Sequence, residues 1–229
     1  IEGRYIPMGN SMPSDWHSVA TPLSSNFYGT IEVPTGWHQL EFRFLNDGQV
    51  IDIVTVGPVG VGEVFIVAGQ SNSANSGEFP LTPTDPRVST WGSNGWRFGH
   101  DPQPAATGNG GSPWPVVGDL LTHRYDVPIG FLSVGYGGTK VDRWVPDTND
   151  LFPRITDALD AVGPSGARAI LWHQGESNAG GTTVEDYAEM LGEVVLGSRA
   201  HAGYDIAWLV ARVGFVPNGD PVKMGWVVG

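Results

Sequence analysis

Apolar residues follow two different rhythms along this chain of 229 residues, and the change falls near residue 60. Before that point, apolar and polar side chains alternate in short segments, as in the run from Gln39 to Phe44. A period of two is typical of antiparallel strands that have one solvated face. The sequence therefore predicts a small β-rich unit over residues 5–60, with a hairpin turn at Asn46-Asp47-Gly48 and strands at 26–33, 37–44 and 49–56.

Beyond residue 60, short continuous apolar runs alternate with segments whose apolar residues recur at helical spacing. The continuous runs predict strands at 63–68, 128–134, 167–173 and 205–213. The helical spacing predicts helices over 115–124, 151–162 and 183–196. Because strands and helices alternate, we expect an α/β domain over residues 61–229, with a parallel sheet covered by helices.

Residues 72–114 interrupt this alternation. They are rich in proline and contain a cluster of glycines and three tryptophans. A segment of this length without secondary structure is uncommon in a compact domain and is usually functional or disordered. We therefore predict a long loop here, at the mouth of a site.

The composition removes several classes of function. Hydrophobic residues make up 40% and charged residues 16%, as in a globular protein, and the formal net charge of −12 argues against nucleic acid or an anionic membrane as a partner. The absence of cysteine excludes disulfides and thiolate chemistry. No apolar stretch reaches the roughly 18 residues that span a bilayer. Residues 1–4 resemble a protease site left by an expression tag, and we set them apart from the fold.

Ser71 is the first candidate for chemistry, because it follows the buried strand predicted at 63–68. In open α/β sheets, ligands bind beyond the carboxyl ends of the strands. A hydroxyl placed there can act as a nucleophile once a base removes its proton. The surrounding Gly69-Gln70-Ser71-Asn72-Ser73 resembles the G-x-S-x-G elbow without its last glycine, which argues against an ordinary α/β-hydrolase. A serine in a simple strand-to-helix turn is the alternative.

Two later strand ends carry further polar groups. Gly138 follows the strand at 128–134 in a glycine-rich turn, where a backbone N–H can approach a ligand closely. Gln174 follows the strand at 167–173 and offers an amide donor suited to an oxyanion. Glu176, two residues later, can orient a histidine or remain a solvated acid. These groups predict a hydrolase site, although each taken singly is also compatible with an ordinary turn.

Three sequence blocks occur in a specific order: Gly-Gln-Ser-Asn at 69–72, Gly-Gly-Thr at 137–139 followed by Trp144, and Trp-His-Gln-Gly-Glu-Ser at 172–177. Over about residues 35–215, the chain resembles the branch of the SGNH hydrolases that contains sialate O-acetylesterases and carbohydrate esterase family 6. The resemblance implies a three-layer α/β/α fold with a flavodoxin-like parallel sheet and a small N-terminal antiparallel β-unit. It also implies hydrolysis of O-acetyl esters on carbohydrate without a metal or organic cofactor.

The resemblance further implies a role for each candidate. Ser71 would attack the acetyl carbonyl, and the N–H groups of Ser71 and Gly138 with the Gln174 side chain would hold the oxyanion. Glu176 would support a catalytic histidine, whereas other relatives use the aspartate of a C-terminal Asp-x-x-His. No Asp-x-x-His occurs in residues 213–229. We therefore expect that the domain lacks its C-terminal end here, and that a further segment supplies the histidine.

Other interpretations stay open. A non-catalytic carbohydrate-binding module on an esterase-like scaffold would account for the absent histidine and for loop tryptophans that could contact sugar, which are Trp91, Trp96, Trp114 and Trp144. A lipase or thioesterase would require a broad apolar acyl pocket. Sialic acid, xylan and other acetylated polysaccharides are all compatible substrates. The acidic run Asp147 to Asp150 is predicted to cap a helix rather than to bind a metal.

Overall fold

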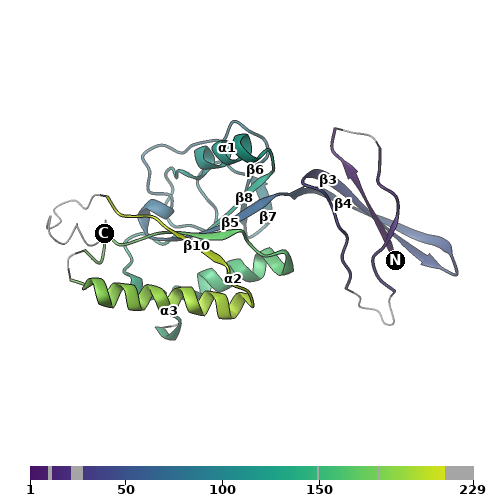
Figure 1. Ribbon diagram of the computed structural model, residues 1–229. Coiled ribbons are helices and arrows are strands. Elements are labelled where there is room, and N and C mark those ends of the chain that lie inside the picture. Colours follow the sequence, from purple (N-terminus) through teal and green to yellow (C-terminus); the bar gives the residue numbers. More distant parts are fainter. Residues whose placement is uncertain (10–11, 22–27, 149, 180, 215–229) are drawn as a thin grey trace. The chain divides into compact units, whose positions relative to one another are not determined.

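The computed structural model describes residues 1–9, 12–21, 28–148, 150–179 and 181–214. The chain divides into two compact units, shown in Figure 1. One unit consists of Ile1–Gly62 together with Asp126–Pro128, and the other consists of Glu63–Tyr125 together with Ile129–Gly229. Each unit has its own sheet, so the two are described in turn.

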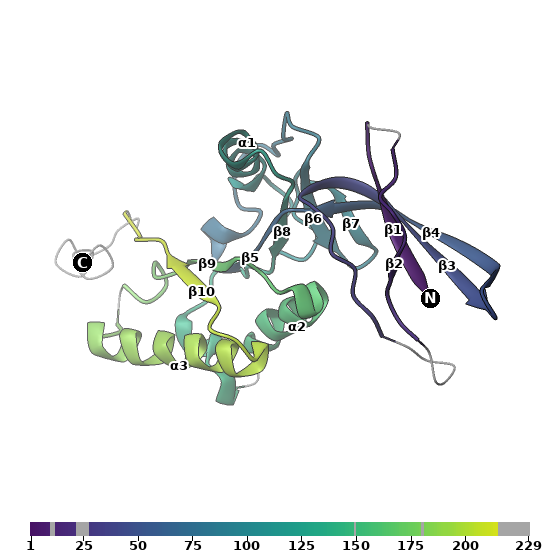
Figure 2. The same cartoon turned by 45° about the vertical axis from the view of Figure 1, so that its right-hand side comes forward.

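The first unit is a four-stranded antiparallel sheet with the strand order β2-β1-β3-β4. Its strands are β1 (Glu2–Pro7), β2 (His17–Ser18), β3 (Gly36–Asn46) and β4 (Gln49–Val61). The long β3–β4 hairpin curves beside the two short strands (Figure 2). Asp47 and Gly48 have φ angles of 50° and 78°, as a two-residue type I′ turn requires. The predicted turn and the strands predicted at 37–44 and 49–56 are therefore confirmed.

Two expectations for this unit are wrong. The strand predicted at 26–33 does not form over residues 28–33, and residues 26 and 27 lie outside the described part of the chain. Residues 2–4, which were set apart from the fold, lie in β1. The physical reason for the second outcome is strand pairing. Because β1 pairs along the edge of β3 that β4 leaves free, residues 2–4 belong to the sheet.

The second unit contains a six-stranded sheet with the order β10-β9-β5-β8-β6-β7, in which only β6 and β7 pair antiparallel. Its strands are β5 (Glu63–Gly69), β6 (Val88–Gly92), β7 (Gly95–Phe98), β8 (Ile129–Ser133), β9 (Ala169–His173) and β10 (Ala207–Val210). The four strands predicted in this unit are confirmed as β5, β8, β9 and β10. The carboxyl ends of β5, β8 and β9 reach the same edge of the sheet because these strands are parallel.

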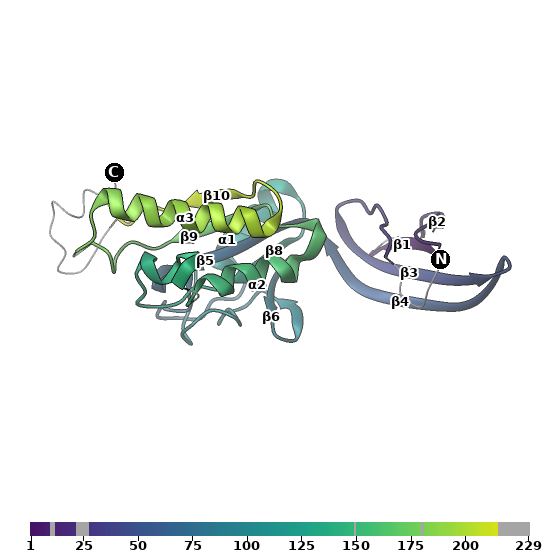
Figure 3. The same cartoon turned by 90° about the horizontal axis from the view of Figure 1, so that it is seen from below.

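Helices cover both faces of this sheet. Helix α1 (Trp114–Tyr125) packs on one face, and α2 (Phe152–Val162) and α3 (Val184–Ala202) pack on the other (Figures 1 and 3). The sequence marks the ends of α3: the Thr183 hydroxyl accepts a hydrogen bond from the N–H of Asp186, and Gly203 ends the helix with a φ of 74°. All three predicted helices are confirmed, and the unit has a three-layer α/β/α fold.

The long loop predicted at 72–114 contains secondary structure, so that prediction is wrong in part. Strands β6 and β7 form a hairpin inside it, and β6 pairs in parallel with β8. The rings of Trp91 and Trp96 pack across the hairpin with their centroids 5.5 Å apart. The sequence carried a signal for this hairpin, because two short β-prone runs flank the turn residues Ser93 and Asn94.

The hydrophobic core of this unit lies around the central strands. Ile66, Leu132 and Ile170 come from β5, β8 and β9 and have less than 2% of their surface exposed. Trp144 and Trp172 are equally buried and meet edge to face, with ring centroids 5.4 Å apart. Continuous apolar runs form these strands because helices cover both faces of the sheet. Among the helices described, none is at once long and apolar enough to cross a membrane.

Candidate active site

The first sequence block forms the turn at the end of β5. Gly69 has a φ of +123°, and a Cβ atom there would lie 2.2 Å from the carbonyl oxygen of His173, so only glycine fits. The N–H of Gln70 donates to that same carbonyl at 2.9 Å. Ser71 then starts a short 3₁₀ helix that ends at Ser73. These contacts fix the start of the turn against β9.

Ser71 is partly exposed, whereas Ser73 is fully buried. The Ser73 carbonyl accepts hydrogen bonds from the Ser133 hydroxyl at 2.9 Å and from the indole N–H of Trp114 at 3.0 Å. The Ser71 hydroxyl has no hydrogen-bond partner among the described residues. The turn is therefore anchored through Ser73, and the Ser71 side chain is left available for a ligand.

Two glutamines join the three sequence blocks. The Gln174 Nε2 atom lies 3.1 Å from Gln70 Oε1, 2.9 Å from the carbonyl oxygen of Thr139 and 2.7 Å from Asn178 Oδ1. Gln70 Oε1 also accepts a bond from the N–H of Ser177 at 3.1 Å. The three predicted strand ends therefore do meet. An amide has only two N–H protons, and Gln174 already shares them among three oxygen atoms, so its role as an oxyanion donor stays a prediction.

The second block presents Gly138 on an open surface. Gly138 is exposed, has a φ of +73° and would have no heavy atom within 4 Å of an added Cβ. The next residue, Thr139, is buried, and its hydroxyl accepts a hydrogen bond from the indole N–H of Trp144 at 3.1 Å. The Gly-Gly-Thr block and its tryptophan thus form one structural unit that holds the glycine turn at the rim.

The third block places a carboxylate beside the first. Glu176 Oε1 accepts a short hydrogen bond from the Asn72 side chain and lies 3.7 Å from His173 Nε2. The other oxygen, Oε2, is buried and has no hydrogen-bond partner among the described residues. A buried carboxylate oxygen without a donor is costly. It therefore marks a position where a donor from a ligand, a water molecule or another side chain would be stabilising.

Ser71 and His173 line the same cavity, which has a volume of about 500 Å³. His173, the histidine of the third block, is the last residue of β9, and its ring is partly exposed and reaches the cavity. A histidine at the carboxyl end of a parallel strand could have been assigned to the site by the rule that was applied to Ser71.

Tyr187 of α3 contacts the third block through its hydroxyl group. Its hydroxyl donates to the carbonyl oxygen of Gln174 at 2.9 Å and accepts a bond from the indole N–H of Trp172 at 3.2 Å. Burial of the hydroxyl raises the pKa of Tyr187 to about 12. The phenol therefore stays protonated, and continues to donate to the third block, throughout the physiological pH range. No local pattern in the sequence indicated this contact, because Tyr187 lies on a separate helix.

None of the four loop tryptophans that could contact sugar lines the cavity beside Ser71. Trp114 and Trp144 are buried, with 8% and 0% of their surface exposed. Trp91 and Trp96 pack against each other in the β6–β7 hairpin. Indole rings are large apolar groups, and here they serve packing. The expectation that these tryptophans form the mouth of the Ser71 cavity is therefore wrong.

The acidic run at residues 147–150 shows no metal-binding arrangement in its described part. Asp150 pairs with Arg143 at 2.6 Å, and residue 149 lies outside the described residues. Within the described chain, no group of three or more histidine, aspartate or glutamate side chains is placed to hold a metal ion. The described site thus consists of hydroxyl, amide, imidazole and carboxylate groups.

Comparison with known proteins identifies a matching family and several similar solved structures. Residues 61–219 match the model of a family described as carbohydrate esterase, sialic acid-specific acetylesterase. No curated protein sequence matches the chain. A crystal structure of a protein from Arabidopsis thaliana is similar with a TM-score of 0.59 and 16% identity, over 72% of this chain and 78% of that chain. A carbohydrate acetylesterase from Xanthomonas citri is similar with a TM-score of 0.54 and 17% identity, over 99% of this chain and 57% of that chain.

Proposed function

Because the chain belongs to the carbohydrate esterase family of sialic acid-specific acetylesterases, we propose that it hydrolyses O-acetyl esters of carbohydrates through an acyl-enzyme on Ser71. The observation that carries this proposal is the position of Ser71. Its hydroxyl has no partner among the described residues and faces a cavity that His173 also lines. Glu176 lies beside that histidine. Nucleophile, imidazole and carboxylate are the groups that ester hydrolysis by a serine requires.

In the proposed reaction, Ser71 Oγ attacks the acetyl carbonyl carbon, and the sugar hydroxyl leaves when the tetrahedral intermediate collapses. The backbone N–H groups of Ser71 and Gly138 would donate to the oxyanion. Gly138 suits this role because it is exposed at the rim and carries no side chain that could block an approaching carbonyl. Gln174 would be the third donor, and would have to release one of the three oxygen atoms that its amide now contacts.

A histidine would accept the Ser71 proton and then pass it to the leaving sugar oxygen. Glu176 would orient that histidine, because its Oε2 atom can accept a further hydrogen bond. His173 is one candidate, since it lines the cavity and lies 3.7 Å from Glu176. A histidine from a C-terminal segment is the other candidate. Activity of the His173→Asn variant separates them, because it persists only if the base comes from elsewhere.

The decisive test is the variant Ser71→Ala in the full-length protein. We expect hydrolysis of 4-nitrophenyl acetate and of acetylated sugars to fall by a factor of about 10³ or more, because the oxyanion donors alone give little turnover. Ser93→Ala, in the exposed β6–β7 turn, is the matched control and should retain full activity. Covalent labelling by a fluorophosphonate should likewise disappear only in Ser71→Ala. Turnover by Ser71→Ala at the wild-type rate would refute the proposed nucleophile.

One observation favours a second candidate, a carbohydrate-binding scaffold without turnover. No hydrogen bond joins the Ser71 hydroxyl to a histidine among the described residues, and a serine without a base is a poor nucleophile. This candidate predicts that the full-length protein binds acetylated oligosaccharides in calorimetry but releases no acetate from them. Release of acetate that depends on Ser71 would exclude it.

A further inference from the structure

The cavity beside Ser71 is much larger than the acetyl group that the proposed reaction removes. Its volume of about 500 Å³ lies in the range of about 300–1,000 Å³ that holds whole small-molecule ligands. The space beyond Ser71 is therefore available for the alcohol part of the ester. The side chains that line this space indicate what kind of alcohol it accepts.

One wall of the cavity is apolar and open to solvent. Phe79 and Leu81 line it, and 69% and 39% of their surfaces are exposed. Pro113 also contributes to the lining. Among the described residues that line the cavity, Phe79 carries the only phenyl or indole ring. Large apolar side chains left open beside a candidate nucleophile are typical of a surface that binds a ligand.

Asp101 holds this wall in place. Its carboxylate is buried and accepts hydrogen bonds from the backbone N–H groups of Leu81 at 3.1 Å and of Ser112 at 2.7 Å. The Ser112 hydroxyl donates to the same carboxylate at 2.6 Å, and the Gln103 amide does so at 3.0 Å. A carboxylate with several donors is a strong anchor. Leu81 and Ser112 line the cavity, so one buried side chain fixes two parts of its wall.

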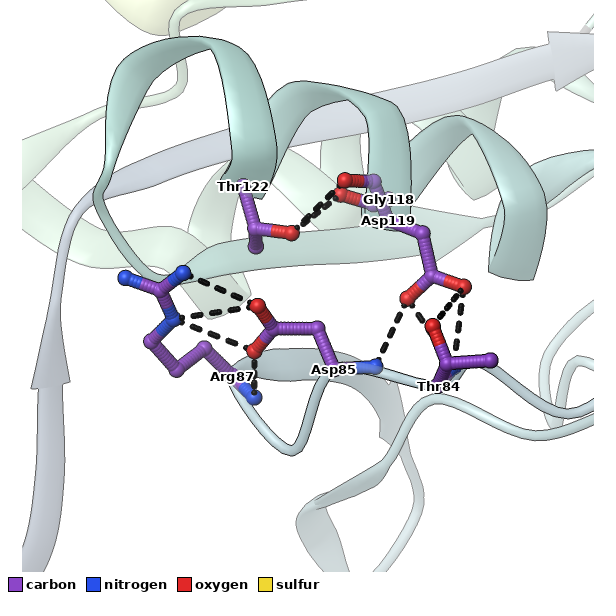
Figure 4. A network of polar contacts seen from close by, with 6 residues as sticks. All are labelled: Thr84, Asp85, Arg87, Gly118, Asp119 and Thr122. Atoms are coloured by element: carbon purple, nitrogen blue, oxygen red, sulfur yellow. Dashed lines mark hydrogen bonds and ion pairs between the residues drawn. The ribbon is translucent and has the colours of Figure 1, made fainter.

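Two further contacts restrain the segment that carries Phe79. At one end, Gly77 and Gly111 pair through two backbone hydrogen bonds of 2.8 and 2.9 Å. At the other end, Asp119 of α1 accepts hydrogen bonds from the N–H groups of Thr84 at 2.8 Å and of Asp85 at 2.9 Å (Figure 4). The segment is thus held at both ends around the exposed ring. A surface held in this way loses little conformational entropy when a ligand binds.

The charge around the cavity selects among sugars. The described residues that line it include no lysine and no arginine. The carboxylate beside His173 is that of Glu176, and the whole chain carries a formal net charge of −12. A sugar carboxylate would therefore meet no fixed cation in this cavity and would be repelled by the protein as a whole. A neutral sugar meets neither obstacle.

We infer that this site takes O-acetyl esters of neutral sugars rather than of sialic acid, and that the ring of Phe79, with Leu81, binds the apolar face of the sugar that carries the acetyl group. This inference rests on the proposed function. An open wall suits a sugar, because one sugar face packs on Phe79 while its hydroxyl groups stay in water. A long acyl chain would stay partly exposed on such a surface and would gain less from it.

The test compares four esters in the full-length protein: an acetylated xylo-oligosaccharide, a mono-O-acetylated N-acetylneuraminic acid, ethyl acetate and an octanoyl ester. We expect kcat/KM to be at least about tenfold higher for the neutral sugar than for the sialic acid. Phe79→Ala should lower kcat/KM for the neutral sugar by about tenfold, mainly through KM, because the variant removes the contact surface. It should leave kcat/KM for ethyl acetate unchanged. Phe79→Trp should restore kcat/KM for the neutral sugar, because it returns an aromatic ring to the wall.

Phe98→Ala is the matched control, because Phe98 is 41% exposed in β7 and does not line the cavity. A preference for the sialic acid ester, or equal losses on the sugar ester and ethyl acetate in Phe79→Ala, would overturn the inference. A loss in Phe79→Ala that is confined to an octanoyl ester would also overturn it, in favour of an acyl pocket. If the wild type releases acetate from none of these esters, the proposed function itself fails.

Discussion

The two units of this protein are stabilised in different ways. Every buried hydrophobic side chain in the described chain belongs to the unit with the parallel sheet. In the antiparallel unit, the described residues with a buried side chain are His38 and Pro128. That unit relies instead on strand pairing and on a surface cluster in which Arg4 and Arg43 stack on Trp16, at 4.5 and 4.4 Å from its ring, and pair with acidic residues, which are Glu41 and Glu2.

This difference accounts for where the candidate chemistry lies. A buried parallel sheet holds its strand ends at fixed positions, because packed cores resist deformation. Groups such as Gln174 and Glu176 can then be placed within hydrogen-bond reach of residues 104 positions earlier in the chain. A thin sheet held by surface ion pairs offers less precise support, since exposed pairs contribute little. The proposed site is accordingly built from residues of the second unit alone.

The largest expected effect is on the free energy of unfolding, and it compares variants of two tryptophans, one from each unit. Trp144→Ala should lower the free energy of unfolding by about 3–5 kcal/mol, because it empties a fully buried site. Trp16→Ala should cost about 1–2 kcal/mol, because it removes two cation–π contacts near the surface, and its cost should shrink in high salt. Denaturant unfolding combined with hydrogen exchange resolves the two units. Equal losses from both variants would contradict the contrast drawn between them.

An intermediate effect tests how burial holds the third block. Because burial raises the pKa of Tyr187 to about 12, the folded state keeps a proton that the unfolded state loses above pH 10. This contribution is complete below pH 10 and is lost as pH rises toward 12, by at most about 2–3 kcal/mol. Tyr187→Phe should therefore flatten the decline in stability between pH 10 and 12.

Tyr125→Phe is the control for this measurement, because Tyr125 is 60% exposed. It should leave the alkaline decline as steep as in the wild type. At neutral pH, Tyr187→Phe should also lower kcat for acetate release, because the Gln174 carbonyl loses its donor. If the stability of Tyr187→Phe declined with alkaline pH as steeply as that of the wild type, burial would not raise the pKa of Tyr187.

The smallest effect is expected at the surface of the second unit. The hydrogen bond from Arg168 lowers the pKa of Glu63, so this pair stabilises the fold above the ordinary pKa of the carboxyl and loses that effect as pH falls. Glu63→Gln should lower Tm at pH 7 by no more than about 2 °C, because Arg168 is exposed. The difference from the wild type should shrink as pH falls below the ordinary pKa of the carboxyl. A larger or pH-independent loss in calorimetry would mean that surface pairs matter in this unit too.

Much of the second unit could be predicted from the chain. The runs that became β5, β8 and β9 are continuously apolar, and the periodicity over 151–162 specified α2. The polar groups after these strands were assigned to one rim because parallel strands share an edge. The pairing of β6 with β8, the position of residues 28–33 and the partners of Gln174 could not be predicted in this way. Each depends on which segment pairs with a strand edge or accepts a hydrogen bond from an amide, and that segment is distant in sequence.

The sequence by itself determined β3, β4, β5, β8, β9 and β10, the three helices and the three blocks that carry the family resemblance. Local periodicity and ordered motifs are properties of neighbouring residues. Only the tertiary structure placed Phe79 rather than a tryptophan in the Ser71 cavity, brought in His173, and assigned Asp101 and Tyr187 to supporting positions. Burial and hydrogen-bond partners arise from packing between segments that are far apart along the chain, and composition and spacing do not contain that information.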